Sequence, residues 1–179
     1  MKKKKVKILY SSKEIQKMIV SLAKRINTEF PEKSSSSKSL VVISVLKGAF
    51  LFTADLIRNI KRQIQLEFVR ISSYGTRQSS SGRIEAPLLS LPDLSNRDVL
   101  IVEDIVDSGR TISFLKDYIQ EQFKPSKLKV ASLLNKKSRR EIDVKADYIG
   151  FEVDNLFLFG YGLDAAEKFR HLPYLAYFD

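Results

Sequence analysis

An acid pair and a loop of small residues follow one apolar run of the chain. The acids are Glu103 and Asp104, and the loop comprises Asp107, Ser108, Gly109, Arg110 and Thr111. A small-residue loop that opens a helix presents free backbone N–H groups and the positive end of the helix dipole, so it can bind phosphate. Carboxylates beside a phosphate need sugar hydroxyls or a cation such as Mg²⁺ between them. The pattern therefore predicts a site for a phosphorylated ribose, whereas acids that merely cap the helix are the weaker interpretation.

The elements that would position these groups are readable on either side of them. Val99–Val102 is a continuous apolar run, which is typical of a strand buried on both faces of a parallel sheet. From Thr111, apolar residues recur with helical spacing at Ile112, Leu115, Ile119 and Phe123. Since open α/β sheets bind ligands at the carboxyl ends of their strands, the acids and the loop lie where a site is expected.

The acid pair and loop together resemble the phosphoribosyl pyrophosphate motif of the type I phosphoribosyltransferases. Asp107 is a third acid, at a position where adenine enzymes usually carry a neutral residue. In this respect the sequence is similar to the branch of the family that acts on 6-oxopurines. The resemblance implies that Asp107 is the catalytic base that accepts the purine N7 proton and that the rest of the loop binds the 5-phosphate. It also implies that Glu103 and Asp104 bind the ribose and a Mg²⁺ ion, with Mn²⁺ as a possible replacement. The implied fold is α/β, a mostly parallel central sheet with flanking helices and a small hood.

Two further segments gain a role from this resemblance. Leu46, Lys47 and Gly48 end another buried apolar run, at Leu40–Leu46, and alone they would indicate an ordinary turn between a strand and a helix. In the family the corresponding loop binds pyrophosphate. A long polar stretch that begins at Ser73 and Tyr74 would otherwise be a flexible surface loop, but the resemblance makes these two residues the start of a lid over the pyrophosphate.

A residue for purine recognition is expected directly after Leu128–Leu134, an apolar run that predicts another buried strand. Lys136 follows that strand within a basic cluster, which is most often a solvated loop. The family uses a lysine here to bind the exocyclic oxygen of the base, and an ammonium group has donors only, so it recognises a 6-oxo but not a 6-amino group. The sequence assigns no role to five other cations: Arg77, Arg83, Lys137, Arg139 and Arg140.

The carboxyl-terminal segment carries the second resemblance to the family. By itself, its run of aromatic residues would indicate one face of a strand. The resemblance makes it the hood that covers the purine and assigns four roles. Phe157 stacks on the base, Leu158 offers backbone groups to its edge, Asp164 belongs to the purine site and also binds Mg²⁺, and Arg170 contacts pyrophosphate.

Composition limits the remaining possibilities. The chain has 179 residues, one histidine and no cysteine, which excludes a disulfide framework and a Cys/His zinc site. The apolar runs are too short for a signal peptide or a membrane span, so a cytoplasmic protein without membrane contact is expected. The length suits one domain over residues 1–179, with a hood built from the amino-terminal segment and from about residue 140 to 179.

The implied reaction is transfer of 5-phosphoribose from phosphoribosyl pyrophosphate to hypoxanthine or guanine, a step of purine salvage. The partners are then these two substrates and a second copy of the chain, in a homodimer or homotetramer, without nucleic acid. A net charge of +10 keeps a rival open, a regulator on the same fold that binds nucleic acid. A xanthine-preferring enzyme is the other alternative, and the sequence does not decide between hypoxanthine and guanine.

Overall fold

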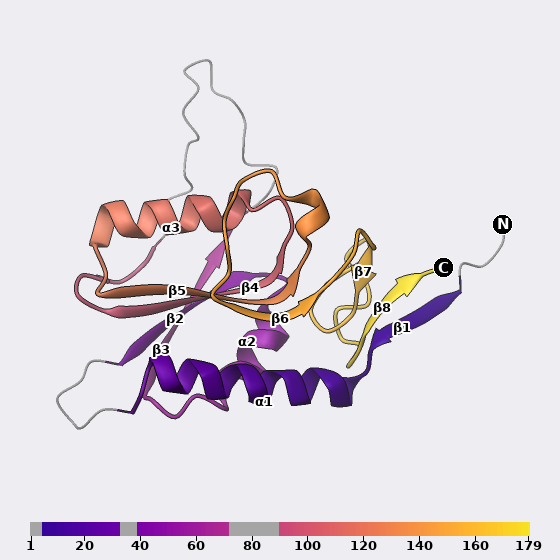
Figure 1. The fold of residues 1–179 in the computed structure, drawn as a ribbon, viewed down its shortest axis with the longest axis horizontal. Coiled ribbons are helices and arrows are strands. Elements are labelled where there is room, and N and C mark those ends of the chain that lie inside the picture. Colours follow the sequence, from indigo (N-terminus) through magenta and orange to yellow (C-terminus); the bar gives the residue numbers. More distant parts are fainter. Residues whose placement is uncertain (1–4, 33–38, 72–89) are drawn as a thin grey trace, which may run out of the picture.

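A computed structural model describes residues 5–32, 39–71 and 90–179 of the chain. Its main sheet has five parallel strands in the order β3-β2-β4-β5-β6 (Figure 1). The strands are β2 (Leu40–Leu46), β3 (Ile64–Arg70), β4 (Asp98–Val106), β5 (Lys127–Asn135) and β6 (Tyr148–Glu152). The expected mostly parallel α/β architecture is confirmed. Its strand order reverses beside β2 and β4, which places a ligand-binding crevice at their carboxyl ends.

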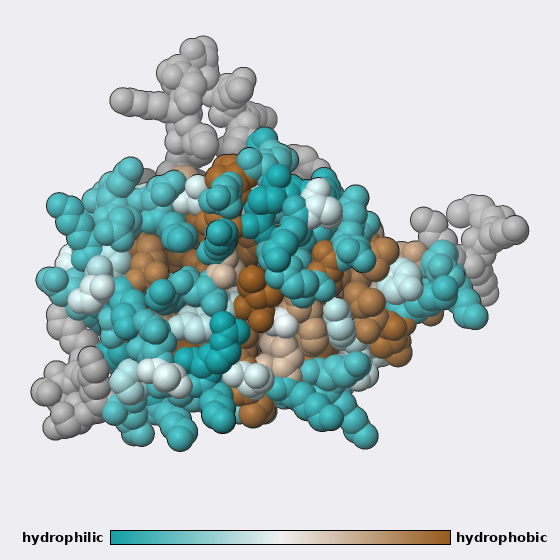
Figure 2. All heavy atoms as spheres, viewed as in Figure 1, coloured by the Kyte–Doolittle hydropathy of each residue, from teal (hydrophilic) through white to brown (hydrophobic). Residues whose placement is uncertain are grey.

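Helices cover both faces of this sheet. Figure 1 shows α1 (Ser12–Glu29) and α2 (Phe50–Ile57) on one face and α3 (Arg110–Phe123) on the other. Within the described ranges, none of the helices has the length and apolar character needed to cross a bilayer. Figure 2 shows a largely hydrophilic surface on one side of the molecule, with apolar side chains reaching it mainly toward the carboxyl-terminal strands.

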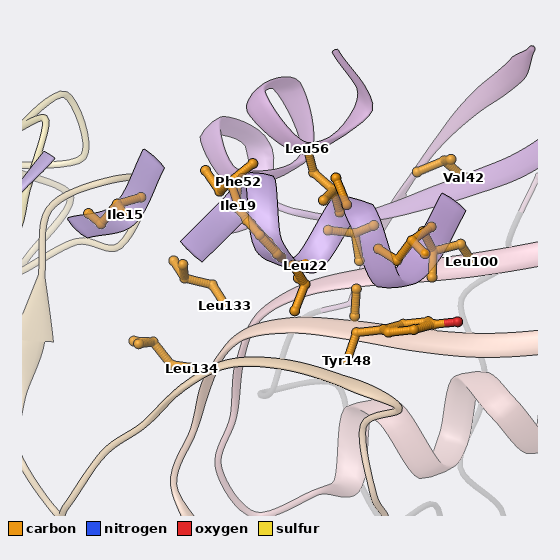
Figure 3. Close-up of a cluster of buried hydrophobic side chains, with 14 of the residues drawn as sticks. Ile15, Ile19, Leu22, Val42, Phe52, Leu56, Leu100, Leu133, Leu134 and Tyr148 are labelled. Atoms are coloured by element: carbon orange, nitrogen blue, oxygen red, sulfur yellow. The ribbon is translucent and has the colours of Figure 1, made fainter. Parts of the chain in front are cut away.

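The core is divided by the sheet because successive strand residues point to opposite faces. Val42 and Leu100 pack with the apolar side chains of α1 and α2 (Figure 3), whereas their neighbours Val41 and Ile101 pack with those of α3. All four side chains are fully buried. Burial on both faces explains why these strands have continuous apolar runs, and it makes the sheet a rigid support for the loops that follow its strands.

A second, antiparallel sheet joins segments from the two ends of the described chain. It contains β1 (Val6–Tyr10), β8 (Leu175–Phe178) and β7 (Leu158–Phe159), in that order. We call these three strands and the turn at residues 160–170 the hood. Because β6 pairs in parallel with β5, it belongs to the main sheet, and the carboxyl-terminal part of the hood begins later than the expected boundary near residue 140.

Candidate active site

The phosphate loop lies between β4 and α3, as the sequence predicts. Gly109 has a φ of +88°, and a Cβ atom there would lie 2.7 Å from Cγ1 of Val144 and 2.8 Å from the carbonyl oxygen of Ile142. The position therefore requires glycine both for its backbone conformation and for its close contacts. The carbonyl of Ser108 accepts hydrogen bonds from the backbone N–H groups of Glu141 and Ile142, at 3.0 Å each. These contacts hold the loop at the amino terminus of α3.

A cavity of about 360 Å³ lies at the carboxyl ends of β2 and β4. It brings together residues from three of the predicted groups, the pyrophosphate loop, the acid pair and the phosphate loop: Leu46, Lys47, Gly48, Glu103, Asp104, Asp107, Ser108, Gly109 and Thr111. Arg110 is the member of the phosphate loop that does not line it. Its guanidinium pairs with Glu141, with 2.6 Å between Nη2 and Oε2. Arg110 thus belongs to the first turn of α3, and its charge does not lie in the cavity.

The pyrophosphate loop and the acid pair are packed directly against each other. A Cβ atom on Gly48 would lie only 1.6 Å from Oδ2 of Asp104, so any side chain there would displace the carboxylate. A Cβ atom on Gly162 of the hood would likewise lie 2.1 Å from the carbonyl oxygen of Gly48. Three segments distant in the sequence meet at this point, and glycine at two of them permits the approach.

The acids at the end of β4 are only partly satisfied by the protein. Burial, reinforced by the negative charge of Asp104, raises the pKa of Glu103 well above its ordinary value. Within the described residues, neither Oε2 of Glu103 nor Oδ1 of Asp107 has a hydrogen-bond partner, although both atoms are buried. Buried polar atoms are normally paired, so both suit a ligand that brings donors or a cation, such as a ribose diol with Mg²⁺.

Asp164 does not join Glu103 and Asp104 in one metal site. Across residues 5–32, 39–71 and 90–179, no three carboxylate, histidine or cysteine side chains are grouped so that they could hold a metal ion. Asp164 pairs instead with Arg170, at 2.8 Å, and accepts the backbone N–H of Glu167, also at 2.8 Å. Mg²⁺ is usually bound through one or two carboxylates together with substrate phosphates, and Glu103 and Asp104 fit that arrangement without a third acid.

Lys136 is buried against the start of the hood. Its side chain is 6% exposed, and its ammonium group donates a 3.0 Å hydrogen bond to the carbonyl of Leu156. This contact places Lys136 beside the segment that contains Phe157, whose ring is 65% exposed, and Leu158, which is buried in β7. An ammonium group has three donors, and the hydrogen bond to Leu156 uses one of them.

Sequence reasoning missed the residues that hold Asp107 in place. The half-buried guanidinium of Arg140 donates to the backbone carbonyl of Asp107 at 3.1 Å and to that of Val106 at 3.2 Å. It also donates to the carbonyl of Val144. Arg139 lies 3.6 Å from the Asp107 carboxylate. The only signal in the sequence was a basic cluster after a strand, and Arg140 differs from a solvated cation by contacts that depend on the tertiary structure.

The remaining residues predicted to bind pyrophosphate are Ser73, Tyr74 and Arg170. Ser73 and Tyr74, with Arg77 and Arg83, lie outside the described residues. Arg170 lies in the hood, where it donates to the carbonyl of Gly162 at 2.9 Å.

Comparison with known proteins identifies the family. The model of the phosphoribosyl transferase domain family matches residues 5–166. The chain therefore belongs to the phosphoribosyltransferases, as the sequence motifs indicate.

Within that family, several similar proteins are named hypoxanthine-guanine phosphoribosyltransferase. The chain is 41% identical to the hypoxanthine-guanine phosphoribosyltransferase of Bacillus subtilis, over 94% of this chain and 91% of the relative. It is 42% identical to the enzyme of that name from Aquifex aeolicus, over 95% and 93% of the two chains. The solved hypoxanthine-guanine phosphoribosyltransferase of Bacillus anthracis superimposes with a TM-score of 0.83 at 39% identity, covering 98% of this chain and 99% of that one. The similarity thus extends over the site and the hood alike.

Proposed function

We propose that this phosphoribosyltransferase transfers 5-phosphoribose from phosphoribosyl pyrophosphate to hypoxanthine or guanine, giving IMP or GMP and pyrophosphate. The observation that carries the proposal is the cavity, where the phosphate loop, the acid pair and the pyrophosphate loop line one space. Each group matches a different part of phosphoribosyl pyrophosphate, namely its 5-phosphate, its ribose hydroxyls and its diphosphate. The full-length similarity to enzymes named for this reaction supports the same conclusion.

Several residues would act on the sugar phosphate. The backbone N–H groups of the phosphate loop and the dipole of α3 hold the 5-phosphate, while Glu103 and Asp104 accept hydrogen bonds from the ribose hydroxyls. As pyrophosphate leaves C1 and positive charge develops on the ring, Lys47 and Arg170 neutralise the departing anion. A bound Mg²⁺ ion would supply further positive charge to the pyrophosphate oxygens.

The purine is bound between the main sheet and the hood. Phe157 stacks on the face of the base, Lys136 donates to its 6-oxygen, and the backbone of Leu158 contacts its edge. The carboxylate of Asp107 then accepts the proton from N7 while N9 attacks C1. Arg140 keeps the backbone of Asp107 in place during this step, since its guanidinium binds the carbonyl of that residue.

A product assay with four bases tests the proposed function. The purified protein is incubated with phosphoribosyl pyrophosphate, Mg²⁺ and hypoxanthine, guanine, xanthine or adenine, and the nucleotides are separated by chromatography. IMP or GMP should form. Preferential formation of xanthosine monophosphate or AMP would assign another specificity. Absence of all products, together with nucleic-acid binding that survives physiological salt, would favour the regulator.

Removal of the divalent metal should abolish turnover. Pyrophosphate is highly charged, so Mg²⁺ or Mn²⁺ should be needed to stabilise its departure. The measurement is initial rate in buffers treated with a chelating resin, followed by titration of MgCl₂ or MnCl₂ back into the same sample. Full turnover in the metal-free sample would contradict the metal assignment.

We also propose that the protein is cytoplasmic and forms a homodimer or homotetramer. Phe68 lies on the edge strand β3 with 52% of its surface exposed, and an edge strand can pair with a second copy of the chain. Light scattering on the purified protein measures the mass directly.

A further inference from the structure

The two cations assigned to pyrophosphate share one acid in the hood. The Nζ atom of Lys47 lies 2.9 Å from Oε2 of Glu167, and Nη2 of Arg170 lies 3.3 Å from Oε1 of the same residue. The two oxygens of a single carboxylate thus contact both cations. Two oxygen atoms of pyrophosphate would make the same contacts with Lys47 and Arg170, since they too are negatively charged acceptors for ammonium and guanidinium donors.

The backbone holds Glu167 in this position. Glu167 has a φ of +60°, and its N–H donates to Oδ2 of Asp164 at 2.8 Å. Asp164 in turn pairs with Arg170 at 2.8 Å, so the turn and one of the two cations are fixed together. The ammonium of Lys47 lowers the pKa of Glu167, and the carboxylate is charged at neutral pH.

The contacts of Glu167 are also of a kind that a substrate can displace. The side chain of Glu167 is 66% exposed and that of Lys47 is 48% exposed. Ion pairs between exposed groups contribute little free energy, so an anion of higher charge readily replaces the carboxylate.

We infer that Glu167 competes with pyrophosphate for the same two cations. The carboxylate of Glu167 binds Lys47 and Arg170 until the diphosphate displaces it, and it binds them again when pyrophosphate leaves. This inference rests on the proposed function, because it concerns the subsite for the diphosphate. It makes Glu167 a positioning residue that weakens the affinity for pyrophosphate and favours its release.

The test measures binding of inorganic pyrophosphate to the whole protein in Mg²⁺ buffer by calorimetry. Glu167→Gln keeps the size and hydrogen-bonding ability of the side chain but removes its charge. It should bind pyrophosphate roughly three- to tenfold more tightly than the wild type. Inhibition of the forward reaction by pyrophosphate should strengthen by the same factor. Unchanged or weaker binding overturns the inference.

A matched control is available at the far end of α1. Glu29 forms an exposed ion pair with Lys127, at 2.8 Å, and neither residue lines the cavity. Glu29→Gln removes one charge of the same sign and should leave the affinity for pyrophosphate as in the wild type. An equal gain in Glu29→Gln would show that only the net charge matters, which also overturns the inference.

A double variant separates the two ion pairs. In the Lys47→Ala background, Glu167→Gln should give a smaller gain in pyrophosphate affinity than in the wild-type background, since one of the two competing contacts is already gone. A gain of the same size in both backgrounds contradicts the assignment. Turnover of hypoxanthine or guanine by the wild type tests the proposed function separately. Failure of the proposed function is therefore distinguished from failure of the role inferred for Glu167.

Discussion

Asp107→Asn should lower the rate of the chemical step about 10²- to 10⁴-fold while the protein remains folded. The amide has nearly the same shape as the carboxylate but does not accept the N7 proton. Arg140 binds the backbone carbonyl at this position, and within the described residues the side chain has only a partly exposed ion pair with Arg139, so the loop is expected to keep its conformation in the variant. The loss should therefore appear in catalysis and not in thermal stability.

Single-turnover kinetics with hypoxanthine provide the measurement, because the steady-state rate of such an enzyme can be limited by product release. Asp117→Asn is the control, since this acid lies exposed on α3 and its neighbour is Ser113. It should react as the wild type does. A single-turnover rate for Asp107→Asn close to that of the wild type would remove Asp107 from the role of general base.

Adenine should be a poorer substrate than hypoxanthine or guanine by roughly 10⁴ in kcat/KM, because Lys136 offers only donors to the base. The 6-amino group of adenine would face the ammonium group donor to donor, leaving buried groups without partners. Lys136→Ala should accordingly lose most of the activity toward both oxopurines. Steady-state kinetics on the three bases measure the discrimination.

Lys137→Ala is the matched control for this prediction. Lys137 is the neighbouring lysine, but its side chain is 74% exposed and pairs with Glu152 at 3.1 Å. The control should retain its activity and its base preference, whereas Lys136→Ala should not. Comparable kcat/KM values for adenine and hypoxanthine in the wild type would rule out Lys136 as the group that selects the base.

The sequence predicted the parts of the site that lie close together along the chain. The apolar run before Glu103, the loop that ends at Thr111 and the Lys47–Gly48 turn are all local patterns. The run lies within β4, and the loop and the turn follow the carboxyl ends of β4 and β2. The end of β4 was less visible. Polar residues follow Val102, yet the strand continues to Val106 because its backbone pairs with β5 up to Asn135.

Contacts between distant segments explain what the sequence did not predict. Arg140 was one cation among several in a basic cluster, and only the folded chain places it under Asp107, 33 residues away. Asp164 was expected beside Glu103 and Asp104, but its pairing with Arg170 depends on the shape of the hood turn. A residue type limits the chemistry that a side chain can do, while its partners are decided by packing.

The pairing of β1 with β8 has a consequence for the order in which the protein matures on the ribosome. Val6 is opposite Phe178, so β1 completes its hydrogen bonds only after β8 has been synthesised. The five strands of the main sheet end at Glu152, and the sheet contains neither β1 nor β8. A nascent chain would therefore acquire its sugar-phosphate half first, and the base-binding half would close only once β8 has been synthesised.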